Sequence, residues 1–363
     1  MKINIRLVPF LACLFSAFVC GAQTRWVDPL EAGAEVHGQG WTELNKTYVR
    51  LPDKAHGVVR DPVWDLSRNS AGLSIVFRSN APEITVQYKV SGALNMFHMP
   101  STGTSGIDLY ATDGNGELRW CAPVFTARFS QEQIEFDYRN LTYYGGDSYE
   151  YHLYLPPYNT VEWIRIGVPE SAALEFYPAE TQRPIVLYGT SIAQGACASR
   201  PGNAWPSIVE REMPYPFVNL GFSGNGKLEK EMFELLSEID ACLYIIDCMP
   251  NMTGLVDEIY GRLIAGVKML RKTNDCPILL VEHSGYVNEV SNETRGNDYK
   301  ATNEQLRRAY LDLLFSGVKD IYYLSHDEIG LGMDGMVEGV HPNDLGMRRQ
   351  ANACEYKIKE ILK

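Results

Sequence analysis

The sequence predicts two domains, a β-sandwich followed by an α/β domain built on a parallel sheet. The chain has 363 residues, and a single hydrophobic core usually stops growing at about 250 to 300 residues. Apolar and polar residues alternate from Trp26 to about Thr181, and short apolar runs separated by amphipathic stretches follow. We therefore expect a sandwich domain at residues 23–181 and an α/β domain at residues 182–363.

The first residues of the chain have the layout of a secretory signal peptide. Lys2 and Arg6 precede an apolar stretch at residues 7–19, and small residues follow it. A stretch this short cannot cross a hydrocarbon core of about 30 Å as a helix. We expect residues 1–22 to be removed and the protein to be exported to the periplasm or the extracellular space, with a lipid anchor at Cys20 as the alternative. No later segment is long and apolar enough for a transmembrane span.

Two segments of the first domain show the period of two that half-buried antiparallel strands require. Apolar residues alternate with polar ones over residues 84–90 and again over residues 149–155. An all-β, jelly-roll-like sandwich is the architecture that we expect from them.

After Thr181 the expected strands are short, apolar on both faces and separated by helices, which indicates a parallel sheet covered on both sides. Ligands of such sheets bind beyond the carboxyl ends of the strands, where Ser191, Gly224 and Asn251 fall. The expected strands are 185–188, 216–220, 242–246, 278–281 and 321–324, and the expected helices are 203–213, 228–238, 254–273, 300–316 and 344–362.

The composition argues against several kinds of partner and cofactor. The formal net charge of −12 disfavours nucleic acid, which binds clustered lysines and arginines. The cysteines after residue 22 are dispersed and several lie in apolar runs, so we expect no disulfide framework. Neither the cysteines nor the histidines show metal-ligand spacing, so we expect no metal site and no organic cofactor.

Ser191 is the candidate nucleophile because it follows an apolar run that ends abruptly at Gly189. A serine at this position could equally cap a helix. The motif is also not the G-x-S-x-G elbow of α/β-hydrolases, since Ala193 stands where the second glycine belongs. The downstream segments favour the catalytic interpretation.

A serine hydroxyl needs a base, and the oxyanion of its tetrahedral intermediate needs fixed donors. His341 is the candidate base, with Glu338 three residues earlier to orient its ring. Gly224 lies in a glycine-rich turn and offers a bare N–H, and Asn251 offers a side-chain amide. Taken singly, each of these residues also suits an ordinary turn or a helix cap.

In this order the segments resemble the SGNH hydrolase superfamily, the GDSL-type esterases, over residues 183–363. The resemblance implies a three-layer α/β/α fold with Ser191 as nucleophile and His341 as general base. It also implies an oxyanion hole made by the Ser191 and Gly224 N–H groups and the Asn251 side chain. The segment Gly106-Ile107-Asp108-Leu109-Tyr110 is similar to the GxDLY motif of a subgroup with an N-terminal β-sandwich.

One position departs from the family pattern, which has Asp three residues before the catalytic histidine. This sequence has Glu338 there. Glu338 is the preferred partner of the imidazole, Asp334 is the alternative, and a Ser–His dyad without a carboxylate is the third possibility.

Three further residues are weaker candidates. His283 ends an expected strand at the active-site edge and is either a pocket residue or a structural histidine. Tyr110 is a possible pocket residue from the first domain. For Asp108 we prefer a role in a tight turn of the sandwich.

The sequence thus predicts an exported serine esterase that removes acetyl or another small acyl group from carbohydrate through an acyl-enzyme. One alternative is a lipase or thioesterase-type acylhydrolase that acts on a non-carbohydrate ester. The other is a carbohydrate-binding protein whose hydrolase domain lost its activity through the change to Glu338.

Overall fold

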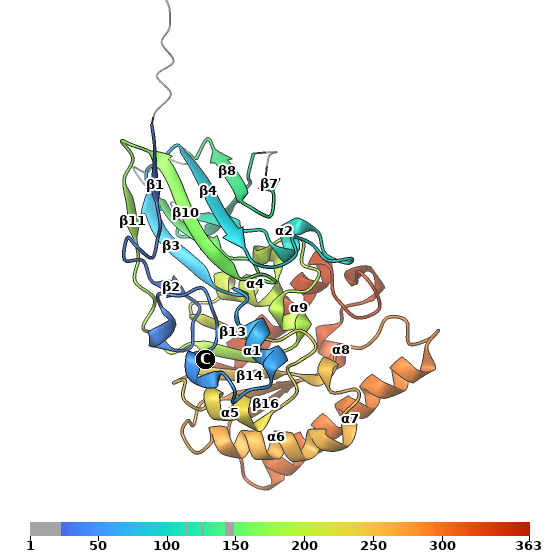
Figure 1. The fold of residues 1–363 in the computed structure, drawn as a ribbon. Coiled ribbons are helices and arrows are strands. Elements are labelled where there is room, and N and C mark those ends of the chain that lie inside the picture. Colours follow the sequence, from blue (N-terminus) through green and yellow to red (C-terminus); the bar gives the residue numbers. More distant parts are fainter. Residues whose placement is uncertain (1–22, 114, 125–126, 142–148) are drawn as a thin grey trace, which may run out of the picture.

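The structure is a computed structural model that describes residues 23–113, 115–124, 127–141 and 149–363. Its antiparallel sheets form the upper part of Figure 1, and a parallel sheet with its helices forms the lower part. The predicted fold class, a β-sandwich before a three-layer α/β/α domain, is confirmed. The expected signal peptide and Cys20 lie outside the described residues. Among the helices of the described ranges, none has the length and apolar character needed to cross a membrane.

Two antiparallel sheets build the sandwich. The first has the order β1 (Thr24–Val27), β10 (Val161–Pro169), β4 (Glu83–Val90), β8 (Ile134–Arg139) and β7 (Arg128–Phe129). The second has the order β11 (Leu174–Phe176), β3 (Ser74–Ser79), β9 (Tyr149–Tyr154), β5 (Asp108–Thr112) and β6 (Leu118–Cys121), with β2 (Val36–His37) paired to β3. The short helix α2 (Ser101–Thr104) lies between β4 and β5 in sequence.

The alternation read from the sequence explains why the two sheets pack together. In β4 every second side chain is buried, beginning with Ile84, and the intervening ones are half-buried or exposed. The buried side chains of β4, β8 and β10 share one apolar core with those of β3, β5 and β9.

The second domain is a five-stranded parallel sheet. Its order is β13 (Phe217–Gly221), β12 (Ile185–Gly189), β14 (Leu243–Asp247), β15 (Ile278–Val281) and β16 (Ile321–Leu324). In β12, Ile185 and Leu187 face one core, whereas Val186 and Tyr188 face another. Both faces are therefore covered, which is why these strands read as continuous apolar runs.

The helices divide between the two faces of this sheet. One face carries α4 (Trp205–Glu212) and α9 (Asp344–Ile361), and the other carries α5 (Lys230–Leu236), α6 (Val256–Leu270) and α7 (Glu293–Phe315). Short helical elements follow several strands: α3 (Ser191–Gln194), η3 (Pro201–Asn203), η4 (Met249–Asn251), α8 (His326–Ile329) and η5 (Met333–Gly335).

The segment Trp41–Arg68 differs from the sandwich expected over residues 23–181. It is helical, with η1 (Thr42–Leu44), η2 (Asp53–Ala55) and α1 (Asp61–Ser67), and α1 lies near β13 in Figure 1. Most of its buried apolar side chains join the core of the parallel sheet, whereas Tyr48 joins the core of the sandwich. The reason is that its apolar side chains share a core with side chains of β13 and α5, which lie far along the chain.

Candidate active site

Three adjacent strands bring the loops of the site together. Strand β12 lies between β13 and β14, and the last residues of the three strands stand opposite one another. The loops that leave these carboxyl ends therefore start at the same level of the sheet. They carry Ser191, Gly224 and Asn251, as the sequence predicted for parallel strands.

Ser191 is the first residue of α3, directly after β12, and its side chain is almost buried. The first N–H groups of a helix have no partner within the helix. Within the described parts of the chain, the Ser191 N–H has no other acceptor either. The turn therefore presents the Ser191 hydroxyl and a free N–H from one residue.

A chain of hydrogen bonds joins Ser191 to a histidine and a carboxylate from the loop before α9. Ser191 Oγ lies 2.8 Å from His341 Nε2, and His341 Nδ1 lies 2.5 Å from Glu338 Oε1. The same Oε1 accepts the His341 backbone N–H at 2.9 Å. With Nδ1 donating to Glu338, Nε2 is the ring atom free to accept the proton of the serine.

Glu338 is ionised at neutral pH. Burial raises the pKa of its carboxyl, but the hydrogen bonds from the His341 backbone and ring, with the charge of that ring, lower the pKa by more. The net pKa lies below the ordinary value, so a negative charge faces the imidazole. Asp334 instead lies exposed in η5, and among the described residues no hydrogen bond joins its carboxylate to His341. Of the two carboxylates left open by the sequence, Glu338 makes the contact.

The loop that carries the histidine is held at both ends. The Val337 N–H donates to the His341 carbonyl at 2.9 Å. Asn343 caps α9, since its Oδ1 accepts the N–H groups of Leu345 and Gly346 at 3.0 and 3.2 Å. These bonds fix the backbone on either side of the imidazole.

Gly224 offers its N–H in a conformation that suits glycine. Its φ is +68°, in the left-handed region, and a Cβ there would meet nothing within 4 Å. Its N–H has no acceptor in the part of the chain that the structure describes. A ligand can therefore approach this backbone directly.

Asn251, at the end of η4, offers a second kind of donor. Its amide fits its surroundings when Oδ1 accepts the N–H groups of Asn225 at 3.0 Å and Gly226 at 3.1 Å. Nδ2 then lies on the opposite side of the amide as a donor. The three predicted oxyanion donors thus come from three neighbouring loops.

The sandwich contacts the serine turn directly. The hydroxyl of Tyr158, between β9 and β10, donates to the Ser191 carbonyl at 3.2 Å. His98, in the loop after β4, places its ring 5.5 Å from the His341 ring, measured between centroids. The sequence did not reveal His98, because a lone histidine in a loop carries no motif.

Arg50 is a further residue that the sequence did not reveal. It is 1 % exposed, and its guanidinium donates to four backbone carbonyls. Two of them, those of Asn219 and Gly221 at 3.2 and 2.7 Å, belong to β13, whose loop carries Gly224. The other two, those of Leu66 and Asn69, lie at 2.6 and 2.8 Å. Arg50 therefore ties the helical segment to the strand that positions an oxyanion donor.

The GxDLY motif contributes to the domain interface rather than to the serine. The Asp108 carboxylate accepts from Arg200 Nη1 at 2.5 Å and from the Gly202 N–H at 2.9 Å. The Tyr110 hydroxyl accepts from the same Arg200 at 2.7 Å, and Arg211 covers the Tyr110 ring. The prediction that Asp108 stabilises a turn was wrong, since Asp108 lies on β5 and bonds across the interface. We assign Tyr110, a predicted pocket residue, to the same interface.

His283 is held by structural contacts. It is 1 % exposed, its Nδ1 accepts the Gly285 N–H at 2.9 Å, and the Asn303 side chain bonds its backbone on both sides. Burial, helped by the charge of His326, lowers the pKa of His283 to about 3, so its ring is neutral. The structural alternative left open by the sequence therefore describes this residue better than a pocket role.

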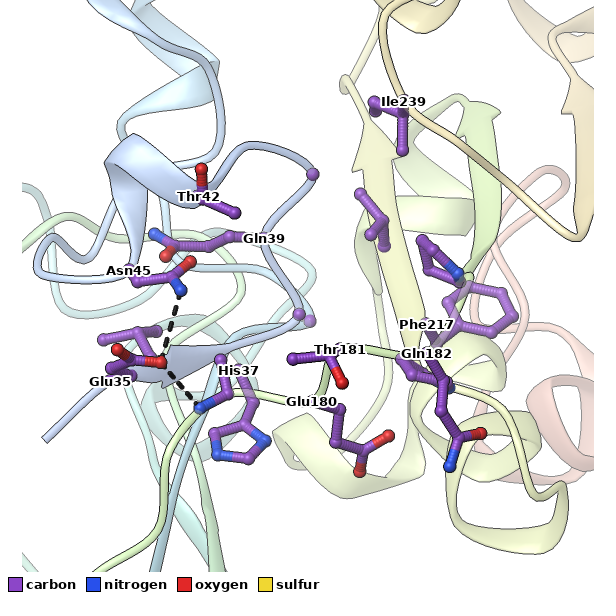
Figure 2. A pocket seen from close by; sticks show the side chains of 18 of the residues that line it. Glu35, His37, Gln39, Thr42, Asn45, Glu180, Thr181, Gln182, Phe217 and Ile239 are labelled. Atoms are coloured by element: carbon purple, nitrogen blue, oxygen red, sulfur yellow. Dashed lines mark hydrogen bonds between the residues drawn. The ribbon is translucent and has the colours of Figure 1, made fainter. Parts of the chain in front are cut away.

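A pocket of about 340 Å³ lies elsewhere, where β2 and residues 179–184 meet the start of β13 (Figure 2). Glu35, His37 and Glu180 line it. Burial lowers the pKa of His37 to about 4. This pocket lies at the amino ends of the parallel strands, whereas ligands of such sheets bind at the carboxyl ends. It includes none of the candidate catalytic residues.

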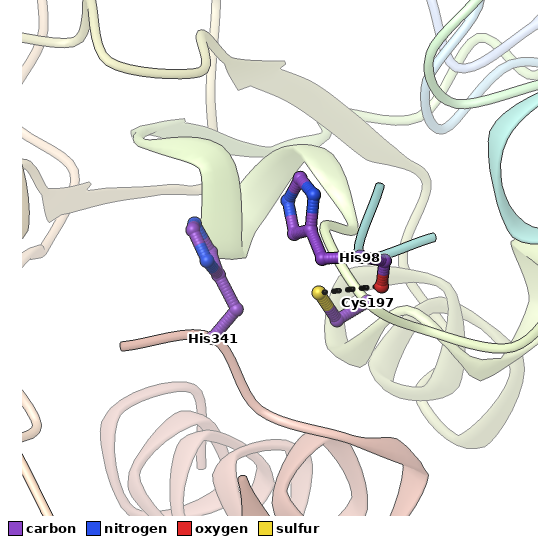
Figure 3. A group of neighbouring side chains, drawn as sticks. All are labelled: His98, Cys197 and His341. Atoms are coloured by element: carbon purple, nitrogen blue, oxygen red, sulfur yellow. Dashed lines mark hydrogen bonds between the residues drawn. The ribbon is translucent and has the colours of Figure 1, made fainter. Parts of the chain in front are cut away.

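A group of possible metal ligands lies beside the serine. One ligand atom each of His98, Cys197 and His341 lie within 4.8 Å of one another (Figure 3). Zinc binds cysteine as the thiolate, whereas the Cys197 thiol donates to the His98 carbonyl at 3.6 Å. His341 Nε2 already faces Ser191. These donors fit a serine–histidine pair better than a metal site. Within the described residues, no disulfide joins Cys197, Cys242, Cys248, Cys276 or Cys354.

Residues 182–359 match the GDSL-like Lipase/Acylhydrolase family, and residues 24–174 match the N-terminus of SGNH-hydrolase-type esterases. No curated protein matches the chain.

Among solved structures, one from Bacteroides ovatus ATCC 8483, assigned as a GDSL-like lipase, is 32 % identical with a TM-score of 0.85. The match covers 94 % of this chain and 98 % of that one. Two more distant structures share the fold. The salicylyl-acyltransferase SsfX3 from a tetracycline biosynthetic pathway is 18 % identical, with a TM-score of 0.68 and coverage of 93 % and 97 %. A family two carbohydrate esterase from Cellvibrio japonicus is 12 % identical, with a TM-score of 0.59 and coverage of 94 % and 98 %.

Proposed function

The chain belongs to the GDSL-like Lipase/Acylhydrolase family, with the N-terminal domain of SGNH-type esterases, and from this premise we propose a specific activity. The protein is an exported serine esterase that removes acetyl or another small acyl group from carbohydrate. The observation that carries the proposal is the chain of hydrogen bonds from Ser191 through His341 to Glu338. The same chain of bonds argues against the alternative of an inactive binding protein.

The first half of the reaction acylates the serine. His341 Nε2 takes the proton of Ser191 Oγ as the oxygen attacks the ester carbonyl carbon. The resulting oxyanion accepts from the N–H groups of Ser191 and Gly224 and from the Asn251 amide. As the tetrahedral intermediate collapses, the bond to the alcohol oxygen breaks, and His341 returns the proton to that oxygen. The alcohol leaves and the acyl group stays on Ser191.

The second half uses water in place of the alcohol. His341 takes a proton from water, the hydroxide attacks the acyl carbon, and the same donors hold the oxyanion. Collapse releases the carboxylic acid, and His341 returns its proton to Ser191 Oγ. In both halves the Glu338 carboxylate holds the ring orientation and stabilises the imidazolium that forms.

Three observations support carbohydrate as the alcohol part of the substrate. The sequence has the layout of an exported protein, and export exposes an enzyme to polysaccharides. The attached sandwich contacts the serine turn through Tyr158. A family two carbohydrate esterase shares the whole two-domain fold.

The test is acetate release from acetylated xylan and from ethyl acetate, with the wild type, Ser191→Ala and Ser237→Ala. Ser237 caps the end of α5, and its hydroxyl donates to the Glu234 carbonyl of that helix, so its variant controls for loss of a serine hydroxyl as such. We expect release from both substrates by the wild type and by Ser237→Ala, and none by Ser191→Ala at an unchanged Tm. Turnover by Ser191→Ala at the wild-type rate would exclude the proposed nucleophile.

The outcome also separates the alternatives. Activity on ethyl acetate but not on xylan, rising with acyl-chain length in a series of esters, would favour a lipase or thioesterase. Tight binding of xylan fragments without acyl release would favour the binding protein.

A further inference from the structure

A loop of the sandwich, residues 92–99 between β4 and α2, lies beside the catalytic histidine. Within it, the His98 ring lies 5.5 Å from the His341 ring, measured between centroids. The ring of Phe97 lies 4.2 Å from that of His98, tilted by 33°. Three rings therefore form a row that begins at the proposed general base and ends at Phe97.

The 92–99 loop is held in place by both domains. Asn159 fixes its start, because its side-chain amide accepts a backbone N–H at 2.7 Å and donates to a carbonyl at 2.9 Å. Met96 and Met99 exchange two backbone hydrogen bonds of 3.1 Å. From the other domain, the Cys197 thiol donates to the His98 carbonyl at 3.6 Å. The position of the rings is thus a property of the assembled fold.

The row ends in apolar surface that nothing in the described residues covers. Phe97 is 98 % exposed, although phenylalanine is usually buried. His98 Nδ1 is enclosed, with no hydrogen-bond partner among the described residues, so no ring bond from that atom commits it to a structural role. Burial and the neighbouring His341 lower the pKa of His98. A neutral His98 does not repel the imidazolium that forms on His341 during the reaction.

The chemistry decides which part of an ester meets this row. The carbonyl oxygen must face the donors of Ser191, Gly224 and Asn251, and the alcohol oxygen must come within reach of His341 Nε2, which protonates it. The alcohol part of the substrate therefore extends on the side of His341. His98, the first ring of the row after His341, is therefore a neighbour of the group that protonates the alcohol.

We infer that Phe97 is a substrate-binding residue, which stacks on the apolar face of the ring of the alcohol part, a sugar ring under the proposed function on which this inference rests. His98 lies between Phe97 and the proposed base and supports the stack. The sandwich then serves as a specificity element for the leaving group, besides bracing the α/β domain.

The test compares kcat and KM for acetylated xylo-oligosaccharides and for ethyl acetate, whose alcohol has no ring. The variants are Phe97→Ala, Phe97→Trp and the control Phe315→Ala. Phe315 is 85 % exposed at the end of α7, so its variant removes another largely exposed ring far from the site in sequence. We expect Phe97→Ala to raise KM for the oligosaccharides by about tenfold, the upper range for an aromatic pair. On ethyl acetate, Phe97→Ala should have the kinetics of the wild type. Phe97→Trp and Phe315→Ala should match the wild type on both substrates.

Equal losses on both substrates, or no loss on either, would overturn the inference. Failure of the proposed function gives a different result, which is a wild type inactive on every ester. In that case, binding of acetylated xylo-oligosaccharides is measured by calorimetric titration. The two proteins compared are Ser191→Ala and the double variant Ser191→Ala/Phe97→Ala. Binding that Phe97→Ala weakens by about tenfold supports the inference. Equal binding, or none by either protein, refutes it.

Discussion

Replacing Glu338 by Gln tests whether this carboxylate completes the catalytic group. Gln has the same length, and its oxygen can accept the same two N–H groups, which lie 2.5 and 2.9 Å from Glu338 Oε1. The variant therefore keeps the loop and the ring orientation, and removes only the negative charge. We expect its Tm to stay close to that of the wild type.

The size of the loss follows from the charge that faces the imidazolium. With both charges delocalised, their centres lie about 4 Å apart, and at an effective dielectric constant of 20 they attract by about 4 kcal/mol. The Glu338 side chain is 38 % exposed, so water screens part of this attraction. About 2 to 3 kcal/mol remain, which corresponds to a fall in kcat/KM of about 30- to 150-fold.

The assay is kcat/KM for p-nitrophenyl acetate between pH 5 and 9, with Asp334→Asn as the matched control. Asp334 is the exposed alternative carboxylate, and we expect its variant to stay within about twofold of the wild type. A Glu338→Gln variant as active as the wild type would mean that the pair works as a dyad. A larger loss in Asp334→Asn would move the role to that residue.

Three further predictions concern the interior of the α/β domain and the oxyanion hole. Burial raises the pKa of Asp247 from 3.8 to about 7. As the pH rises, this carboxyl therefore ionises in the unfolded chain before it ionises in the folded protein, so the free energy of unfolding falls between about pH 4 and 7. Urea unfolding of Asp247→Asn should show a gain over the wild type that is about 2 to 3 kcal/mol larger at pH 8 than at pH 5, and an equal effect at both pH values would contradict this. Arg50→Met leaves four carbonyls without their donor and should lower the free energy of unfolding by about 3 to 5 kcal/mol, measured in urea; a loss under about 1 kcal/mol would speak against the bracing role. Asn251→Ala should lower kcat by about 10²- to 10³-fold with little change in KM, measured on ethyl acetate, because the amide acts on the oxyanion; a rise in KM alone would make it a ground-state contact.

The parallel sheet could be predicted almost residue by residue. The strands expected at 278–281 and 321–324 are β15 and β16 with the same bounds. Buried parallel strands must be apolar on both faces, so the pattern is local and strong. Helix α7 was harder, since it begins at Glu293 rather than at residue 300. Its first turns are polar and lack the apolar period, and Asn292 starts the helix by capping it.

Part of the candidate site could likewise be predicted from local sequence patterns, whereas the rest depends on contacts between residues far apart in the chain. Ser191, Gly224 and Asn251 follow strands, so their common edge is a consequence of the topology. Choosing between Glu338 and Asp334 needed the loop geometry, because either side chain could reach from the same loop. His98 and Phe97 lie in a loop without a motif, and only the packing of the two domains brings His98 next to His341.

The Trp41–Arg68 segment makes the two halves of the chain depend on each other as the protein is made. Arg50 and the carbonyl it binds on Gly221 are 171 residues apart in sequence, so this bond cannot form until the first strands of the second domain have been synthesised. Until then, the apolar residues of the segment have no parallel-sheet core to pack against. A gene fragment cut near residue 182 would leave both products with an uncovered apolar face. We therefore expect the sandwich and the α/β domain to stay together in one gene, although the sequence pattern changes clearly between them.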